Sequence, residues 1–136
     1  MTEKIVPDTS IIIDGKLSEL IERGETKTDI VIPEFVVDEL ENQANEGKET
    51  GYRGIEEIKK IRMLAEREGL NLSFKGRKST TEEIELSHNG RIDALIRDMA
   101  EEMDATLFTA DAVQGKIARA KGIEVREFKT ETDLDF

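Results

Sequence analysis

Short apolar runs alternate with amphipathic stretches along nearly the whole chain. Residues 5–7, 29–32, 70–74, 105–109 and 123–125 have the length and apolar character of strands. Between them, apolar residues recur at helical spacing in residues 15–23, 34–45, 55–68, 91–103 and 112–121, and the Gly47 to Gly51 stretch is expected to be a loop. Strands that alternate with helices form parallel sheets, so an α/β fold is predicted, with helices on both faces of a mostly parallel sheet of about five strands. The alternating pattern of residues 70–74 predicts a strand near an edge.

The composition excludes several classes of site. The chain has 136 residues, no cysteine and one histidine, His88. The lack of cysteine excludes disulfides, thiol catalysis and cysteine-ligated metals, and one histidine excludes a histidine pair or a histidine-rich zinc site. The length suits a single domain, expected at residues 1–128, with the acidic residues 129–136 as a tail or the start of a linker. No apolar run is long enough to cross a membrane, so a cytoplasmic protein without a membrane partner is expected.

The charge of the chain is unevenly distributed. The net charge is −11, yet residues 48–78 contain nine Lys or Arg and only five acids. An acidic protein with one basic segment can still bind a polyanion, particularly if metal ions neutralise its acidic site. The candidate contacts to such a polyanion are the basic residues Lys59, Lys60, Arg62, Arg77 and Lys78. The alternative is that this segment forms a solvated basic helix on an acidic protein.

Two aspartates lie just after expected strands. Asp8 comes after residues 5–7, and Asp111 lies two residues after residues 105–109. The carboxyl ends of parallel strands meet at one edge of the sheet, where ligands bind. If both strands are central, the two carboxylates should lie close together. The alternative for Asp111 is that it caps the helix expected to begin at Ala112.

Two further acids lie beside the apolar stripes of expected helices. Asp93 shares a helical line with Ile96 and Ala100, whereas an acid paired with a nearby Lys or Arg is the alternative for this position. In residues 36–41, Glu39 and Glu41 flank the apolar stripe on opposite sides, and periodicity does not choose between them.

A cluster of carboxylates without histidine or cysteine favours Mg²⁺ or Mn²⁺ over zinc. Such an ion lowers the pKa of a bound water, and two ions can stabilise the attacking and leaving oxygens of a phosphodiester hydrolysis. The hydroxyl residues next to two of these acids, Thr9, Ser10 and Thr109, are candidates to orient carboxylates or water.

Four segments in this order resemble the PIN domain family of nucleases, over nearly the whole chain from Ile5 to Val125. They are Pro7-Asp8-Thr9-Ser10, Val31-Ile32-Pro33 with Glu39-Leu40, Arg91 to Ile96, and Thr109-Ala110-Asp111. In that family the second acid directly precedes a leucine, so the resemblance selects Glu39 over Glu41. It implies a Rossmann-like, three-layer α/β/α sandwich and a metal-dependent endonuclease that usually acts on RNA. The implied catalytic and metal-binding residues are Asp8, Glu39, Asp93 and Asp111.

The segments Asp8 to Gly15 and Arg53-Gly54-Ile55 further resemble one branch of the family. This branch includes PIN domains fused to archaeal ATPases and to small RNA-binding modules. It implies such a module as a fused or associated partner, and it has an acid at the position of Asp14, either structural or an auxiliary ligand. A homodimer is also compatible with the sequence.

Three functions are compatible with these patterns. The favoured one is a Mg²⁺- or Mn²⁺-dependent nuclease that acts on single-stranded RNA. The second is a PIN-fold scaffold that binds RNA or a protein with weak or absent cleavage. Phosphoryl transfer of the receiver or phosphatase type is weaker, because those sites usually have a lysine after a late strand, where this chain has Asp111.

Overall fold

The computed structural model describes residues 3–76 and 91–129. Its centre is a five-stranded sheet in the order β3-β2-β1-β4-β5, in which every neighbouring pair is parallel. The strands are β1 (Lys4–Pro7), β2 (Asp29–Pro33), β3 (Leu72–Lys75), β4 (Thr106–Thr109) and β5 (Val125–Glu127). The predicted α/β class and the edge position of the third strand are confirmed. Residues 77–90, with Arg77 and Lys78, and all of the expected tail except Lys129 lie outside the described residues.

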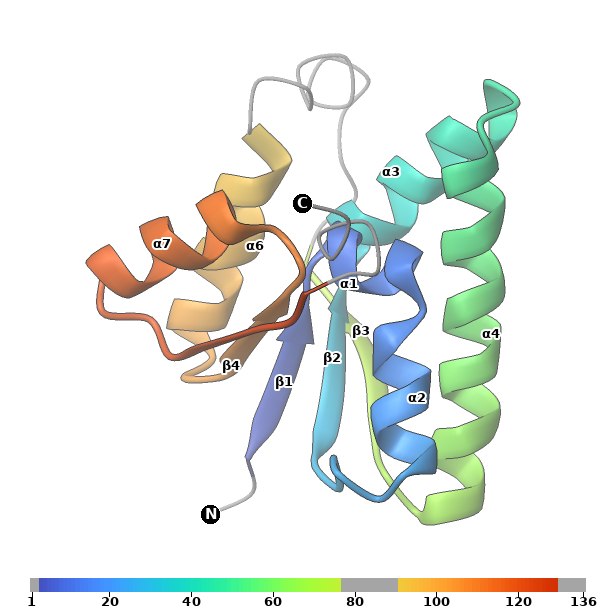
Figure 1. The fold of residues 1–136 in the computed structure, drawn as a ribbon, viewed down its shortest axis with the longest axis horizontal. Coiled ribbons are helices and arrows are strands. Elements are labelled where there is room, and N and C mark those ends of the chain that lie inside the picture. Colours follow the sequence, from blue (N-terminus) through green and yellow to red (C-terminus); the bar gives the residue numbers. More distant parts are fainter. Residues whose placement is uncertain (1–2, 77–90, 130–136) are drawn as a thin grey trace.

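Helices cover both faces of this sheet, which makes three layers (Figure 1). The helices α1 and α2 lead from β1 to β2, α3 and α4 lead from β2 to β3, α6 precedes β4, and α7 joins β4 to β5. Their bounds are α1 (Thr9–Asp14), α2 (Lys16–Glu22), α3 (Glu34–Asn45), α4 (Glu49–Glu68), α6 (Arg91–Glu102) and α7 (Ala112–Ala120). Figure 1 shows α2 and α4 on one side of the sheet and α6 and α7 on the other, while α3 packs against α4 and also contacts α6.

Two segments differ from the sequence-based expectation. The sequence pattern predicts no helix over residues 9–14, but they form α1, which buries Ile11 and Ile12 completely and ends at Gly15 with φ of 75°. Glycine adopts this left-handed conformation without strain, so the chain can turn at once into α2. Gly51 was expected in a loop, but it lies in the first turn of α4 and is buried against α3. A side chain at Gly51 would collide with the backbone of Ala44, so a glycine here permits the close α3–α4 contact.

Aliphatic side chains form most of the core. Val6, Ile30 and Leu107 of the central strands are fully buried, and so are Leu40 of α3 and Ile96 of α6. This packing fixes the positions of the chain turns at the carboxyl ends of β1 and β4. Within residues 3–76 and 91–129, no helix is long and apolar enough to cross a membrane.

Candidate active site

Asp8 is the most buried acid at the carboxyl edge of the sheet, with 1% of its surface exposed. It follows β1 and is the N-cap of α1, where its Oδ1 accepts hydrogen bonds from Ile11 N at 3.1 Å and Ser10 Oγ at 2.6 Å. Its Oδ2 accepts a hydrogen bond from Thr109 Oγ1, at the end of β4. Both carboxylate oxygens are therefore held in fixed positions.

The two hydroxyl groups that donate to Asp8, those of Ser10 and Thr109, also connect the turn after β1 to the turn after β4. Ser10 Oγ accepts from Ala110 N at 3.0 Å, and Thr109 Oγ1 accepts from Asp111 N at 3.0 Å. Ser10 and Thr109 thus have the orienting positions expected from the sequence. Thr9 does not share this arrangement: it is buried, and its Oγ1 has no hydrogen-bond partner in the described part of the chain.

Asp111 is the N-cap of α7, since its Oδ1 accepts from Val113 N at 2.9 Å. The capping role considered from the sequence is therefore confirmed. It does not exclude another role, because a carboxylate has a second oxygen with its own acceptor sites.

Asp93 lies in the first turn of α6, close to Arg97 and Asp111. Its backbone carbonyl accepts a hydrogen bond from Gln114 Nε2 at 3.1 Å, and Gln114 Oε1 accepts one from Arg97 Nη1. Gln114 is buried, with 1% exposure, and it joins α7 to α6. Periodicity did not identify Gln114 or Arg97. The available signal was a glutamine on the same helical side as Gly115 and Ala118 in residues 112–121.

The pKa shifts show that these acids lie near one another. Burial raises the pKa of Asp8 to about 6; the hydrogen bonds from Ser10, Thr109 and Ile11 oppose this rise, and the charge of Asp93 adds to it. Burial raises the pKa of Glu39 to about 7, and repulsion by Asp93 and then by Asp8 contributes.

Burial also raises the pKa of Asp93, with a further rise from Asp111 and an opposing effect of Arg97. Electrostatic interactions therefore link four acids from four separate segments. We call Asp8, Glu39, Asp93 and Asp111 the acid cluster.

The structure separates Glu39 from Glu41, which periodicity could not do. Glu39 is partly buried and interacts with Asp93 and Asp8, and its Oε1 accepts a hydrogen bond from Gln43 Nε2 at 3.4 Å. Glu41 is exposed. Glu39 is therefore the acid of α3 that belongs to the acid cluster.

The chemistry of the acid cluster fits a hard divalent cation. Its donors are carboxylate oxygens. Burial, and then the charges of neighbouring acids, raise the pKa values of three of its four members, and a bound cation would lower these pKa values again. In residues 3–76 and 91–129, however, no three acid or histidine side chains are already arranged to hold one ion together. Binding would therefore require side-chain movement, or oxygen ligands from water and substrate, which Mg²⁺ commonly keeps.

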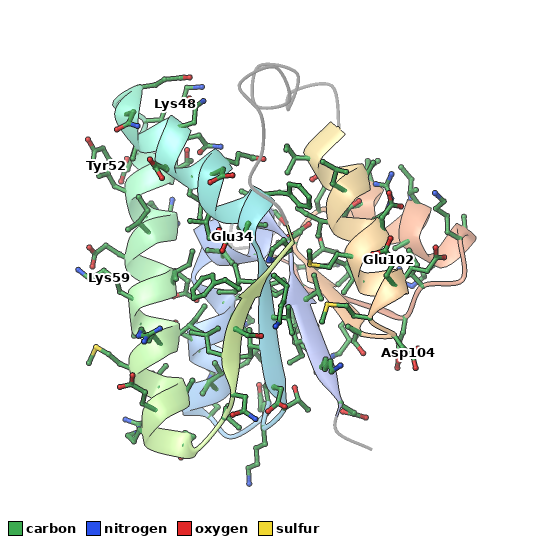
Figure 2. The ribbon with its side chains drawn as sticks, turned by 180° about the vertical axis from the view of Figure 1, so that it is seen from behind. Glu34, Lys48, Tyr52, Lys59, Glu102 and Asp104 are labelled. Carbon is green, nitrogen blue, oxygen red and sulfur yellow. The ribbon has the colours of Figure 1, made fainter. Side chains whose placement is uncertain are left out.

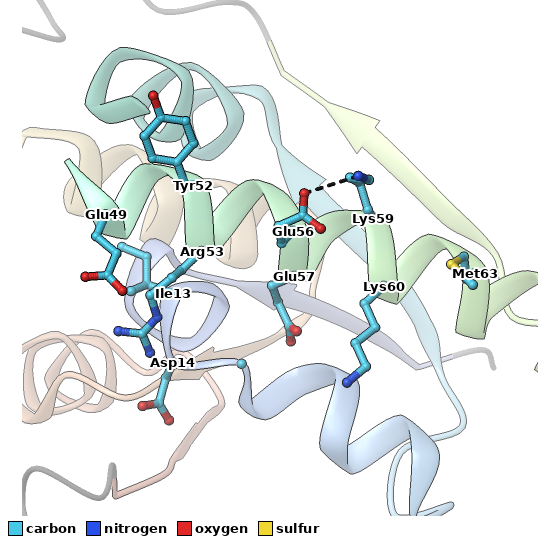
Figure 3. A pocket seen from close by; sticks show the side chains of 11 residues that line it. Ile13, Asp14, Glu49, Tyr52, Arg53, Glu56, Glu57, Lys59, Lys60 and Met63 are labelled. Atoms are coloured by element: carbon cyan, nitrogen blue, oxygen red, sulfur yellow. Dashed lines mark hydrogen bonds and ion pairs between the residues drawn. The ribbon is translucent and has the colours of Figure 1, made fainter. Parts of the chain in front are cut away.

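Two of the predicted contact residues, Lys59 and Lys60, line a separate groove between α4 and the α1–α2 segment. We call it the α4 groove; its volume is about 720 Å³ (Figure 3). Its lining includes Asp14, Lys59 and Lys60. Asp14 is the last residue of α1, whereas Asp8 caps the first turn of that helix, so the two acids lie at opposite ends of α1. Figure 3 shows Glu57 and Lys60 pointing from α4 toward the α1–α2 segment, whereas Tyr52 points away.

The α4 groove is balanced in charge. Three basic residues line it, but so do four acids, namely Asp14, Glu49, Glu56 and Glu57. Lys59 Nζ donates to Glu56 Oε1 at 3.1 Å, and Figure 2 shows Lys59 and Tyr52 projecting outward from α4. Arg62 Nε lies 3.7 Å from Glu66 Oε1, on the exposed side of the same helix.

Glu57 is a buried acid with a structural role in the α4 groove. Only 6% of its surface is exposed, and its two oxygens accept from Ser18 N at 2.8 Å and Ser18 Oγ at 2.7 Å, at the start of α2. Burial raises its pKa, and the hydrogen bonds from Ser18 and the charge of Lys60 partly oppose that rise. A carboxylate at a helix N-terminus satisfies free backbone donors, so Glu57 attaches α4 to α2.

Comparison with known proteins identifies the family of this chain. A family model described as PIN domain matches residues 5–129. A KH and PIN-domain containing protein of Methanocaldococcus jannaschii, described as uncharacterised, is 47% identical over 90% of this chain and 19% of its own length. The Holliday junction branch migration ATPase PINA of Sulfolobus acidocaldarius is 29% identical over 89% of this chain and 22% of its own length. A PIN and TRAM-domain containing protein of Thermus thermophilus is 27% identical over 88% of this chain and 33% of its own length.

The chain therefore spans a third or less of each of these relatives. Among solved structures, a domain of a functionally unknown protein from M. jannaschii superposes with a TM-score of 0.89 at 45% identity, covering 94% of this chain and 92% of that one. A PilT N-terminus domain protein of Sulfolobus solfataricus shares the fold, with a TM-score of 0.51 at 16% identity over 91% of this chain and 86% of that one. The chain belongs to the PIN domain family, whose members are generally nucleases that use divalent metal ions.

Proposed function

We propose that this chain is a metal-dependent endonuclease that hydrolyses phosphodiester bonds in single-stranded RNA. In this proposal Mg²⁺ or Mn²⁺ is held by the acid cluster, that is, by Asp8, Glu39, Asp93 and Asp111. The observation that carries the proposal is the convergence of these acids from β1, α3, α6 and the turn after β4, where burial, and to a smaller extent mutual repulsion, raises the pKa values of Asp8, Glu39 and Asp93. Mutual repulsion of acids at one sheet edge is a cost that a bound cation removes.

Neighbouring residues hold two members of the acid cluster in place. Ser10, Thr109 and Ile11 hold the Asp8 carboxylate, so its two oxygens are oriented before an ion arrives. Gln114 fixes the backbone of α6 at Asp93. When bound, the cation supplies an activated water and stabilises the charge of the phosphate in the transition state.

Support for RNA as the substrate comes from the relatives. One carries a KH domain and another a TRAM domain, in addition to the PIN domain, and KH domains bind single-stranded RNA through its backbone. We propose that this chain works beside or joined to such a module, or to an ATPase as in the Sulfolobus relative. This domain would then cleave the RNA, and the module would supply affinity for it.

The basic residues of α4 provide a further proposed contact. The helix α1 has six residues, which corresponds to about 9 Å, and it connects Asp8 at one end to the α4 groove at the other. A strand with its phosphate at the acid cluster can follow α1 and reach Lys59 and Lys60. Arg62 would add a further contact on α4. The proposed contacts also include Arg77 and Lys78, which lie outside the described residues.

A scaffold role is the second candidate, and one observation favours it. In the described residues no three acids are set to hold an ion without rearrangement. A scaffold of this kind would bind RNA or a protein and would not depend on metal for its binding.

Matched substitutions in α3 separate the two functions. Cleavage of a mixed single-stranded RNA by the chain should require Mn²⁺ or Mg²⁺ and stop with chelator. Glu39→Gln should lower the rate by at least about a hundredfold, because even supporting residues of metal sites typically contribute ten- to a hundredfold. Glu41→Gln, two residues away and exposed, should leave the rate unchanged. Equal rates for the two variants, or cleavage that persists in chelator, would contradict the metal-nuclease proposal.

A further inference from the structure

A second cavity, of about 380 Å³, lies beside the acid cluster and is distinct from the α4 groove. We call it the Phe128 cavity. It is lined by Ala110, Asp111, Ala112, Glu127, Phe128 and Lys129. Its volume is within the range of about 300–1,000 Å³ typical of small-molecule pockets, and Asp111 belongs both to this cavity and to the acid cluster.

The backbone fixes Phe128 at the same edge of the sheet as Asp8. Phe128 N donates to Thr109 O at 2.9 Å, which continues the β4–β5 pairing by one step beyond Glu127. The side chain of the same Thr109 donates to Asp8. One residue of β4 therefore touches both the aromatic residue and the most buried acid.

The ring of Phe128 is held in place but not fully covered. Its centroid lies 5.2 Å from that of Phe108, and the Arg126 guanidinium lies 5.0 Å from it. Phe128 is nevertheless only partly buried, and it lines the cavity. The neighbouring walls formed by Ala110 and Ala112 are small, so they leave room next to the ring.

The charges around the Phe128 cavity are two acids and one cation. Glu127 forms an ion pair with Arg119, so its negative charge is neutralised within the protein, and Asp111 is the acid that the proposed function assigns to the metal ion. Lys129 is exposed at the cavity and offers a cation to a phosphate. An aromatic face beside a basic residue is the usual combination for single-stranded nucleic acid, since every base can stack on a ring.

We propose that the Phe128 cavity binds one nucleobase of a single-stranded substrate, stacked against Phe128, with an adjoining phosphate at Lys129. This inference rests on the proposed function, because Asp111 would connect the stacked nucleotide to the metal site. It also explains a preference for single strands: in a duplex, pairing and stacking keep the base from reaching a pocket in the protein.

Two probes of six nucleotides test the stacking directly: oligoadenylate, and the same ribose-phosphate backbone without bases. Binding is measured by fluorescence anisotropy with Mg²⁺, in the Asp93→Asn background so that the probe stays intact. Phe128→Leu keeps an apolar side chain against Phe108 but removes the aromatic face. It should weaken oligoadenylate binding by about fivefold to 150-fold, the range that corresponds to loss of one base–aromatic stack. Its affinity for the abasic probe should be unchanged.

Two further variants complete the experiment. Phe128→Trp should bind oligoadenylate at least as tightly as the parent, and it decides the matter if Phe128→Leu does not fold. Phe74→Leu, at a partly buried aromatic of β3 on the opposite edge of the sheet from β5, is the matched control and should leave both affinities unchanged. An equal loss for both probes in Phe128→Leu, or no loss for either, would overturn the stacking site. Cleavage of RNA by the unsubstituted chain with Mn²⁺ is measured in parallel, so that absence of activity identifies failure of the proposed function separately.

Discussion

At the residue scale, Asp93 offers the clearest distinction between a ligand and a structural acid. It is partly buried, repelled by Asp111 and attracted by Arg97. If it is a metal ligand, Asp93→Asn should lower Mn²⁺-dependent cleavage by at least about a hundredfold. Apo stability should hold or rise, because the substitution removes repulsion. If Asp93 serves mainly as the partner of Arg97, the same change leaves that charge less compensated, and the free energy of unfolding should fall instead.

Chemical denaturation in chelator, beside an RNA cleavage assay with Mn²⁺, measures both quantities. Asp98→Asn is the matched control: Asp98 is on the same helix but exposed, so both its stability and its activity should stay at the parent values. Marked destabilisation of Asp93→Asn together with residual cleavage would contradict its assignment as a ligand.

At the element scale, α4 is predicted to contribute affinity and not chemistry. The double substitution Lys59→Glu/Lys60→Glu should weaken RNA binding and flatten its dependence on salt. For single strands the slope of log K against log salt changes by about 0.7 per phosphate contact, so the loss of two contacts should reduce it by about 1.4. The turnover of bound RNA should remain unchanged, because neither residue belongs to the acid cluster.

The control for α4 is Lys4→Glu/Lys27→Glu, which makes the same change in net charge at the opposite, amino-terminal end of the sheet. If both double variants change the slope equally, the effect comes from total charge. If neither does, the basic residues of α4 serve ion pairs such as Lys59–Glu56 and the RNA path along α1 is wrong.

At the scale of the whole molecule, the acid cluster should make the metal-free protein less stable as pH rises. The pKa values of Asp8 and Glu39 are raised from 3.8 to about 6 and from 4.5 to about 7. These groups bind protons more tightly in the folded chain than in the unfolded one, so their protonated forms favour folding. The free energy of unfolding should therefore fall between pH 4 and pH 7, by on the order of 3 kcal/mol.

Saturating Mn²⁺ should reduce or reverse that fall, because a cation stabilises the ionised carboxylates. At a hundred times its dissociation constant, an ion that binds only the folded state adds about 2.7 kcal/mol. Denaturation curves at several pH values, with Mn²⁺ and with chelator, measure the effect. Asp8→Asn should show a smaller metal effect, and an equal gain in parent and variant would show that the ion binds elsewhere.

The sequence alone determined the architecture and part of the site. Periodicity depends on neighbouring residues, so it identified the strands, most helices and the order that requires a parallel sheet. That geometry in turn brings Asp8 and Asp111 to one edge, because carboxyl ends of parallel strands share a side. Two local expectations are wrong. Gly51 lies in a helix and not in a loop, because α3 packs closely against α4 at this glycine. Residues 9–14 form a helix because Asp8 caps it.

Only the tertiary structure decided which side chains meet across elements. Periodicity leaves Glu39 and Glu41 equal and the family resemblance selects Glu39, but only the packing of α3 near α6 shows Glu39 beside Asp93. The buried Gln114 and the ring of Phe128 gain their positions from contacts to α6 and β4. Such proximities depend on how elements distant in the chain cross and twist, and a single sequence carries no direct record of those angles.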